Sequence, residues 1–154
     1  MISKDDRLLS RLQNACARKE YCSKDIYAKA LKGLDGDAEG AAQMLELLVK
    51  DKYVDDARYA AAFARDKSSL SGWGPVKISY QLRAKGIDNA VISDALRQID
   101  DDKVEDALMK LLSAKYRSLK GDEQLRLKMI RFALSRGYEY DVVDAAVRKI
   151  MVDG

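Results

Sequence analysis

The sequence contains no histidine, and this absence removes the commonest routes to enzyme catalysis. Without an imidazole, neither a Ser-His-Asp triad nor a Cys-His pair can form. Cys16 and Cys22 are the only cysteines, and two thiols cannot close a structural zinc site without histidine. We expect free, packed thiols in a reducing compartment, while a disulfide between them stays open. The sequence thus argues against an enzyme, and we expect neither a cofactor nor a bound metal.

Proline and long apolar runs are also scarce. Pro75 is the only proline, so proline-rich linkers are absent. No apolar run approaches the length of a membrane-spanning helix, and the N-terminal residues MISKDDRLLS lack the apolar core of a signal peptide. We therefore expect a cytoplasmic protein without membrane contact. The glycines around Trp73 lack the glycine-lysine pattern of a phosphate-binding loop.

The residues that are abundant favour helices. Leu, Ala, Lys, Arg and Asp dominate, 47% of the residues are apolar and 34% are charged, which fits a packed core with a solvated exterior. Adjacent carboxylates at 5–6, 55–56 and 100–102 stand where helices are predicted to begin. We interpret them as helix caps instead of acid–base catalysts. The composition predicts an all-α protein.

An internal repeat sets the predicted architecture. Arg83-Ala84-Lys85-Gly86-Ile87 and Ser135-Arg136-Gly137-Tyr138 open similar segments offset by 51 residues, and a fainter copy places Gly33 a further 53 residues upstream. Each glycine is interpreted as a left-handed helix end. The pattern predicts three tandem three-helix repeats, stacked into an elongated, curved array, over residues 1–53, 54–100 and 101–154. The predicted helices are Lys4–Tyr21, Ser23–Lys32, Ala38–Lys52, Asp55–Ser69, Pro75–Lys85, Asn89–Ile99, Asp102–Leu119, Asp122–Arg136 and Tyr140–Met151.

Charge is distributed unevenly. The net charge is only +3, and residues 1–55 are balanced. Between Lys67 and Ile87, however, no acidic residue occurs, and residues 110–137 hold eight basic residues against two acidic ones. An ordinary solvated helix face interleaves both signs. The asymmetry indicates an anionic partner for the second and third repeats.

The candidate contacts follow from this asymmetry. Lys77, Gln81 and Lys85 are spaced by four residues and are predicted to share an outer stripe, which is either an ordinary wet face or a binding face. Trp73 is interpreted as a core anchor, as an exposed stacking residue, or as both through different faces of its indole. Tyr59 and Phe63 are predicted core residues. The candidate partner- or DNA-binding residues are Arg58, Arg65, Lys67, Trp73, Lys77, Gln81, Arg83, Lys85, Lys128 and Arg131.

A family resemblance is carried by these same segments. The run YVDDARYA at 53–60, then Trp73-Gly74-Pro75, and then Lys85-Gly86-Ile87 resemble the signature of the RecX regulatory proteins. The segment CARKEYCS at 16–23 is similar to a version found in some branches of that family. The resemblance covers almost the whole chain and is strongest from Tyr53 to Ile99.

The resemblance implies a fold and a function. RecX-like proteins are built from three tandem three-helix repeats in an extended, curved shape. They are non-enzymatic modulators that bind the recombinase RecA in the groove of its filament on DNA, and they mostly inhibit strand exchange, ATP hydrolysis and coprotease activity. The family has no catalytic set to transfer. The first repeat departs most from the common pattern, because Gly33 and Gly36 lie close together and basic residues are fewer.

Two other functions stay open at this point. The chain could be a general nucleic-acid-binding module, whose DNA affinity without RecA would be tight and steeply salt-dependent. It could also be a scaffold for an unrelated protein partner. For the RecX-like function we expect a monomer that contacts successive RecA subunits and the DNA within or near the filament.

Overall fold

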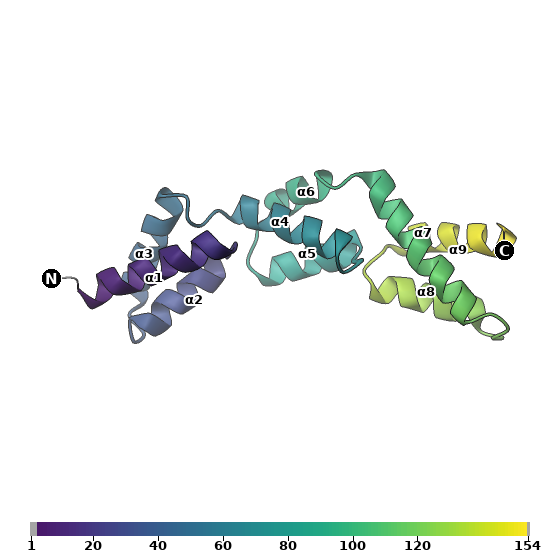
Figure 1. The fold of residues 1–154 in the computed structure, drawn as a ribbon, viewed down its shortest axis with the longest axis horizontal. Coiled ribbons are helices and arrows are strands. Elements are labelled where there is room, and N and C mark those ends of the chain that lie inside the picture. Colours follow the sequence, from purple (N-terminus) through teal and green to yellow (C-terminus); the bar gives the residue numbers. More distant parts are fainter. Residues whose placement is uncertain (1–2, 154) are drawn as a thin grey trace.

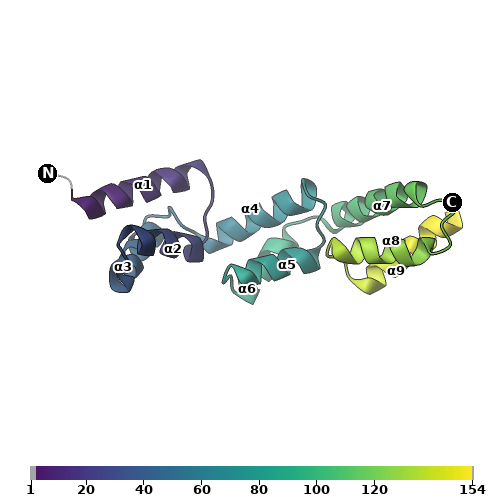
Figure 2. The same cartoon turned by 90° about the horizontal axis from the view of Figure 1, so that it is seen from below.

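The computed structural model describes residues 3–153, and within that range the chain forms helices joined by turns, without a strand. The helices are α1 (Lys4–Arg18), α2 (Ser23–Gly33), α3 (Ala38–Lys50), α4 (Asp56–Ser69), α5 (Pro75–Ala84), α6 (Asn89–Arg97), α7 (Asp101–Ser118), α8 (Leu125–Ser135) and α9 (Tyr140–Asp153). Figures 1 and 2 show an elongated molecule with the two chain ends at opposite extremes.

Three separate apolar cores follow one another along the chain. Helices α1–α3 enclose the first core, around Ile26 and Leu48. Helices α4–α6 enclose the second, around Ile78 and Leu82, and α7–α9 enclose the third. Each helix contributes one apolar stripe, and packing three helices together buries these stripes in a shared core. The predicted all-α fold of three-helix repeats is confirmed.

Carboxylates cap the helix starts, as the sequence predicts. Ser3 and Asp6 form a reciprocal capping box at α1, and the Asp55 carboxylate accepts a hydrogen bond from the Arg58 N–H at α4. Asp100 accepts from the Asp102 N–H at α7. Each cap satisfies a backbone donor that has no partner inside its helix.

Two predicted helix bounds were wrong by three residues, whereas the other bounds lie within two residues of the structure. The prediction ran the first helix to Tyr21, but α1 ends at Arg18 because Lys19 is extended. The prediction began another helix at Asp122, but its carboxylate accepts a hydrogen bond from the Gln124 N–H and forms a turn, so α8 begins at Leu125.

Left-handed glycines follow helices in two of the three predicted places. Gly86 and Gly137 have φ of 76° and 92°, the left-handed geometry predicted for them. The left-handed geometry predicted for Gly33 was wrong, because Gly33 is the last helical residue of α2, and a Cβ there would stand 2.7 Å from the Leu8 side chain. Its lack of a side chain serves close packing of α1 on α2. The left-handed residues at this helix end are Asp35 and Gly36.

Side chains at the first repeat boundary cross it. Val54 packs in the first core and Cys22 in the second. The residue limits given above for the repeats stay predictions. Both cysteines are free, and Cys22 is fully buried. Among the helices of residues 3–153, none combines the length and apolar content that crossing a membrane requires.

Candidate interaction surface

Trp73 lies half-buried on the second core with cations over its ring. Its indole meets Phe63 edge-on, with ring centroids 6.1 Å apart. The Nζ atoms of Lys67 and Lys77 stand 4.8 and 4.4 Å from the Trp73 ring centroid, within the range of a cation–π interaction. The indole therefore contacts the core, which is one of the two roles predicted for Trp73, while its role as a stacking residue for a partner stays a prediction.

A second aromatic–cation cluster lies on the third repeat. Lys115 Nζ stands 4.7 Å from the Phe132 ring centroid, and the Arg136 guanidinium carbon stands 5.1 Å from it. Sequence reasoning missed Lys115 and Arg136 as candidates. Arg136 could have been predicted, because it follows Phe132 by four residues, as Lys67 follows Phe63, and side chains four apart meet on a helix face.

The joint between the second and third repeats pairs the backbone segments that lie next to the two clusters. The Gly74 N–H donates to the Arg136 carbonyl at 2.7 Å, and the Val76 N–H donates to the Gly137 carbonyl at 2.9 Å. Trp73 therefore directly precedes a residue that is hydrogen-bonded to Arg136. We call Lys67, Lys77, Lys115 and Arg136, with Trp73 and Phe132, the cationic seam.

Missing side chains make this joint possible. A Cβ on Gly74 would stand 2.5 Å from the Gly137 carbonyl oxygen, and a Cβ on Gly137 would stand 2.6 Å from the Lys77 backbone nitrogen. The Tyr138 hydroxyl adds a hydrogen bond of 3.2 Å to the Gly72 carbonyl. Main-chain groups thus hold the second joint, which explains why a glycine follows Trp73.

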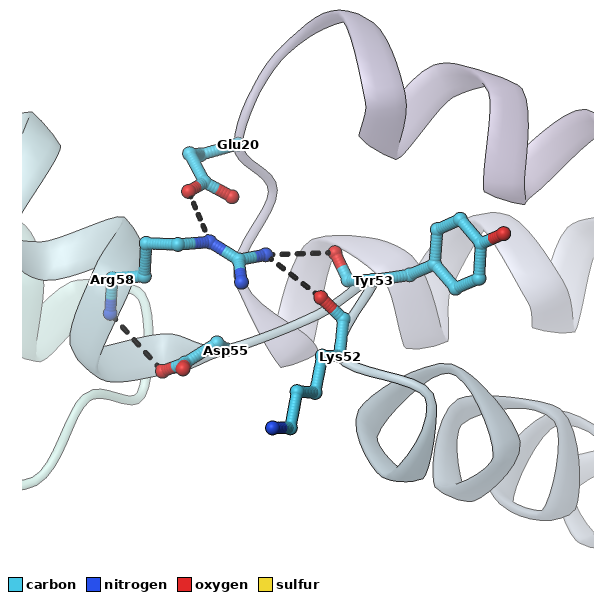
Figure 3. Close-up of polar contacts among 5 residues, drawn as sticks. All are labelled: Glu20, Lys52, Tyr53, Asp55 and Arg58. Carbon is cyan, nitrogen blue, oxygen red and sulfur yellow. Dashed lines mark hydrogen bonds and ion pairs between the residues drawn. The ribbon is translucent and has the colours of Figure 1, made fainter.

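The joint between the first and second repeats is held by side chains instead. Figure 3 shows Arg58, near the start of α4, forming an ion pair with Glu20. The same guanidinium donates to the Lys52 and Tyr53 carbonyls at 3.1 and 3.2 Å. The hydrogen bond to Glu20 raises the Arg58 pKa above its ordinary value. Arg58 is therefore engaged in joining the repeats, and its contact with a partner stays a prediction.

Lys85 joins the same two repeats. Its Nζ lies 3.0 and 3.2 Å from the Asp25 carboxylate oxygens, and this hydrogen bonding raises the Lys85 pKa. Lys77 packs at the other joint. The predicted outer stripe is therefore half-buried at Lys77, Gln81 and Lys85, because its two ends lie at the two joints. The predicted outer stripe is only partly exposed, and its use as a binding face stays a prediction.

The remaining candidates are exposed. Arg65 forms a pair with Asp66 at 3.7 Å, and Lys128 forms one with Asp122 at 2.7 Å. That hydrogen bond from Lys128 lowers the Asp122 pKa. Arg83 and Arg131, by contrast, form no ion pair within the part of the chain that the structure describes. Contact of all ten candidate residues with a partner stays a prediction.

The cations of the seam are available for a ligand. Among residues 3–153, no carboxylate forms an ion pair with Lys67, Lys77, Lys115 or Arg136. Their amino and guanidinium groups stay free to donate to an anion while resting on an aromatic face. Over the same range, no group of three or more Cys, Asp or Glu side chains gathers in a way that could hold a metal ion. The arrangement fits recognition of an extended anion.

Comparison with known proteins supplies a family. A model of the second three-helix domain of RecX matches residues 55–96, and a model of its third three-helix domain matches residues 101–147. The regulatory protein RecX of Clostridium perfringens (strain 13 / Type A) is 34% identical, over 97% of this chain and 72% of that protein. RecX of Clostridium tetani is 31% identical over 83% of this chain, which spans only 60% of that relative.

A solved structure shows the same fold. The crystal structure of RecX from Lactobacillus salivarius superposes with a TM-score of 0.83 and covers 97% of both chains at 21% sequence identity. The likeness therefore extends through the first helical group as well as through the two groups that the domain models match.

Proposed function

The chain belongs to the RecX family of regulatory proteins, and on that premise we propose that it binds the filament that RecA forms on DNA and lowers its ATPase, strand-exchange and coprotease activities. In this proposal the chain is a monomeric, cytoplasmic binding protein without an enzymatic activity of its own. Its helical groups contact successive recombinase subunits, and its cations contact DNA within or near the filament.

The observation that carries the proposal is the cationic seam at the second joint. An elongated chain of separately cored helical groups offers a long surface for a repetitive partner. The seam adds free cations, which can contact phosphates, beside the aromatic rings of Trp73 and Phe132. A filament of protein on DNA presents both kinds of surface.

The test is the DNA-dependent ATPase of RecA. With the filament formed on poly(dT), increasing amounts of the protein are expected to lower the rate of ATP hydrolysis to a plateau. The double variant Lys67→Glu/Lys77→Glu is expected to need about tenfold more protein for the same inhibition, because each reversal replaces an attraction to phosphate with a repulsion. An unchanged ATPase rate at saturating wild-type protein would refute the proposal.

A matched control separates the seam from net charge. The variant Lys32→Glu/Lys50→Glu carries the same charge change on exposed positions of the first repeat. It is expected to inhibit nearly as the wild type does. Equal losses in both double variants would show that overall charge, and not the seam, governs binding. Helix content by circular dichroism verifies that each variant is folded.

The seam also favours a second candidate function, general binding of single-stranded nucleic acid. Its cations would displace at most a few counterions, so the slope of log affinity against log salt is expected near −3 at the steepest, from about −0.7 for each neutralised phosphate. Tight binding of poly(dT) without RecA, with a slope of that size, would favour this candidate. Weak binding that becomes strong only with the filament favours the proposed function.

A further inference from the structure

An open groove lies on the third repeat, between α7 and α9. Its volume is about 680 Å³, and Pro75 of the second repeat lines it together with residues of the third. The floor is apolar, with Val104, Leu108, Met109 and Val142 among its side chains. Val142 is 47% exposed, so apolar surface in this groove faces water in the free chain.

The rim of the groove is acidic, although the whole chain has a net charge of +3. Asp101, Glu105, Glu139 and Asp141 line it, against the single basic residue Lys149. All four acidic residues are exposed, and none forms an ion pair with another residue of the described range 3–153. The groove therefore has the opposite sign from the cationic seam.

Helix capping does not account for the whole rim. Asp101 and Asp141 lie in the first turns of α7 and α9, where a carboxylate offsets the helix dipole. Glu105 stands a full turn further along α7, beyond the reach of that effect. An apolar floor beside Glu105 is typical of a recognition groove. In such a groove the buried apolar area supplies the affinity, and the charges determine which partner binds.

We propose that this groove binds a basic amphipathic helix of a partner protein. The apolar stripe of such a helix, with side chains three and four residues apart, packs on the floor between α7 and α9. Its flanking Lys and Arg side chains pair with Glu105, Glu139 and their acidic neighbours. Charge complementarity selects this occupant, because an acidic or neutral helix gains nothing from the rim. The inference is independent of the proposed function, since it needs neither RecA nor DNA.

The test uses a peptide probe with the full chain. A fluorescein-labelled, 18-residue helical peptide of leucines and lysines, with the leucines on one face, is titrated with the protein in a polarisation assay. A dissociation constant on the order of 10 µM is expected for so small an interface. A peptide with glutamate in place of every lysine, and a scrambled peptide that has no apolar face, are expected to bind at least tenfold more weakly.

Two variants locate the binding. Glu105→Lys/Glu139→Lys reverses the charge at two positions of the rim. Binding is expected to weaken about tenfold, because exposed ion pairs with the peptide are replaced by repulsions. Ala145→Trp places a large side chain on an exposed position that lines the groove, and it is expected to block the peptide. Ala42→Trp, on an exposed position of α3, is the matched control and is expected to bind as the wild type does.

Three outcomes would overturn the inference. The first is no binding of the peptide up to millimolar protein. The second is binding that Ala145→Trp leaves unchanged, which would place the peptide elsewhere. The third is a concentration-dependent dimer in size-exclusion chromatography that Ala145→Trp abolishes, since this would make a second copy of the chain the occupant. The exposed Leu127 and Leu134 of α8, on either side of Arg131, are the face such a copy would use.

Discussion

Replacing Gly137 with alanine is expected to open the joint between the second and third repeats. Gly137 has φ of 92°, a conformation that costs an alanine roughly 1–2 kcal/mol. Its new Cβ would also stand 2.6 Å from the Lys77 backbone nitrogen, a contact that a flexible side chain cannot relieve. Relieving it moves the backbone apart and strains the hydrogen bond from Val76 to the Gly137 carbonyl.

A matched glycine allows the two costs to be separated. Gly121 has φ of 91°, and a Cβ there meets no atom within 4 Å. Gly121→Ala therefore carries the conformational cost alone, roughly 1–2 kcal/mol. Gly137→Ala adds the overpacking, typically about 1–3 kcal/mol, so it is expected to cost about 2–5 kcal/mol in all. The difference between the two variants measures the close approach of the repeats.

Hydrogen exchange is the suitable assay, because repeats can unfold separately and a single unfolding midpoint would average them. The amides of Gly74 and Val76 cross the joint, and both are expected to exchange at least tenfold faster in Gly137→Ala than in Gly121→Ala. The amide of Ile92, inside the second repeat, is expected to change little between them. Equal exchange of the joint amides in both variants would refute the reasoning, because the contact with Lys77 would then cost nothing.

Three further predictions follow from the same structure. Trp73 is the only tryptophan, so its fluorescence emission is expected to shift when poly(dT) is added. The variant Lys67→Gln/Lys77→Gln is expected to bind poly(dT) about tenfold more weakly, as measured by the same shift. Arg58→Lys keeps the charge but loses the planar guanidinium that bridges Glu20 and two backbone carbonyls. Chemical denaturation is expected to show an unfolding free energy lower by roughly 1–2 kcal/mol. An unchanged midpoint would count against this role of Arg58. Burial raises the pKa of Cys22 above its ordinary 9.0, so its stabilising contribution is complete below pH 9.0 and declines as pH rises through the folded pKa. A pH titration of unfolding is expected to show this decline, smaller in Cys22→Ala.

The repeated helices could be predicted because their signals are local. A carboxylate caps a helix through a backbone N–H within three residues, as Asp55 does with the Arg58 N–H. Gly137 likewise terminates its helix through its own left-handed conformation. Trp73 contacts the second core, which is one of the roles that its segment left open. Periodicity and capping operate within a few residues, so sequence alone resolves them.

The joints could not be predicted for the opposite reason. Lys85 forms its ion pair with Asp25, which lies 60 residues away, and the Tyr138 hydroxyl meets the Gly72 carbonyl 66 residues away. No helical period carries such pairings. The sequence predicts the stripe that Lys85 shares with Lys77 and Gln81, but it does not predict that Asp25 stands against Lys85, because a helical period gives the face of a residue and not its neighbour.

The groove was missed for a related reason. The sequence places Asp101 and Glu139 beside the starts of different helices, and each is explained locally as a cap or a polar helix start. Only folding puts both on the rim of one hollow with an apolar floor. A carboxylate that caps a helix can therefore also belong to a binding site. Glu105 indicates this site, because it lies beyond the capping turn and forms no ion pair within residues 3–153.

The two joints differ in the kind of contact that holds them, and this difference predicts how each responds to salt. Main-chain hydrogen bonds and glycine contacts hold the second joint, and neither salt nor pH weakens them appreciably. The first joint depends on half-exposed pairs of Arg58 and Lys85, whose strength falls as ions screen them. We therefore expect added salt to loosen the first joint and to leave the hydrogen bonds of the second joint nearly unchanged. The cationic seam and the acidic groove both lie beside this salt-resistant joint, so a partner that presents an anion and a basic helix would meet the two surfaces together.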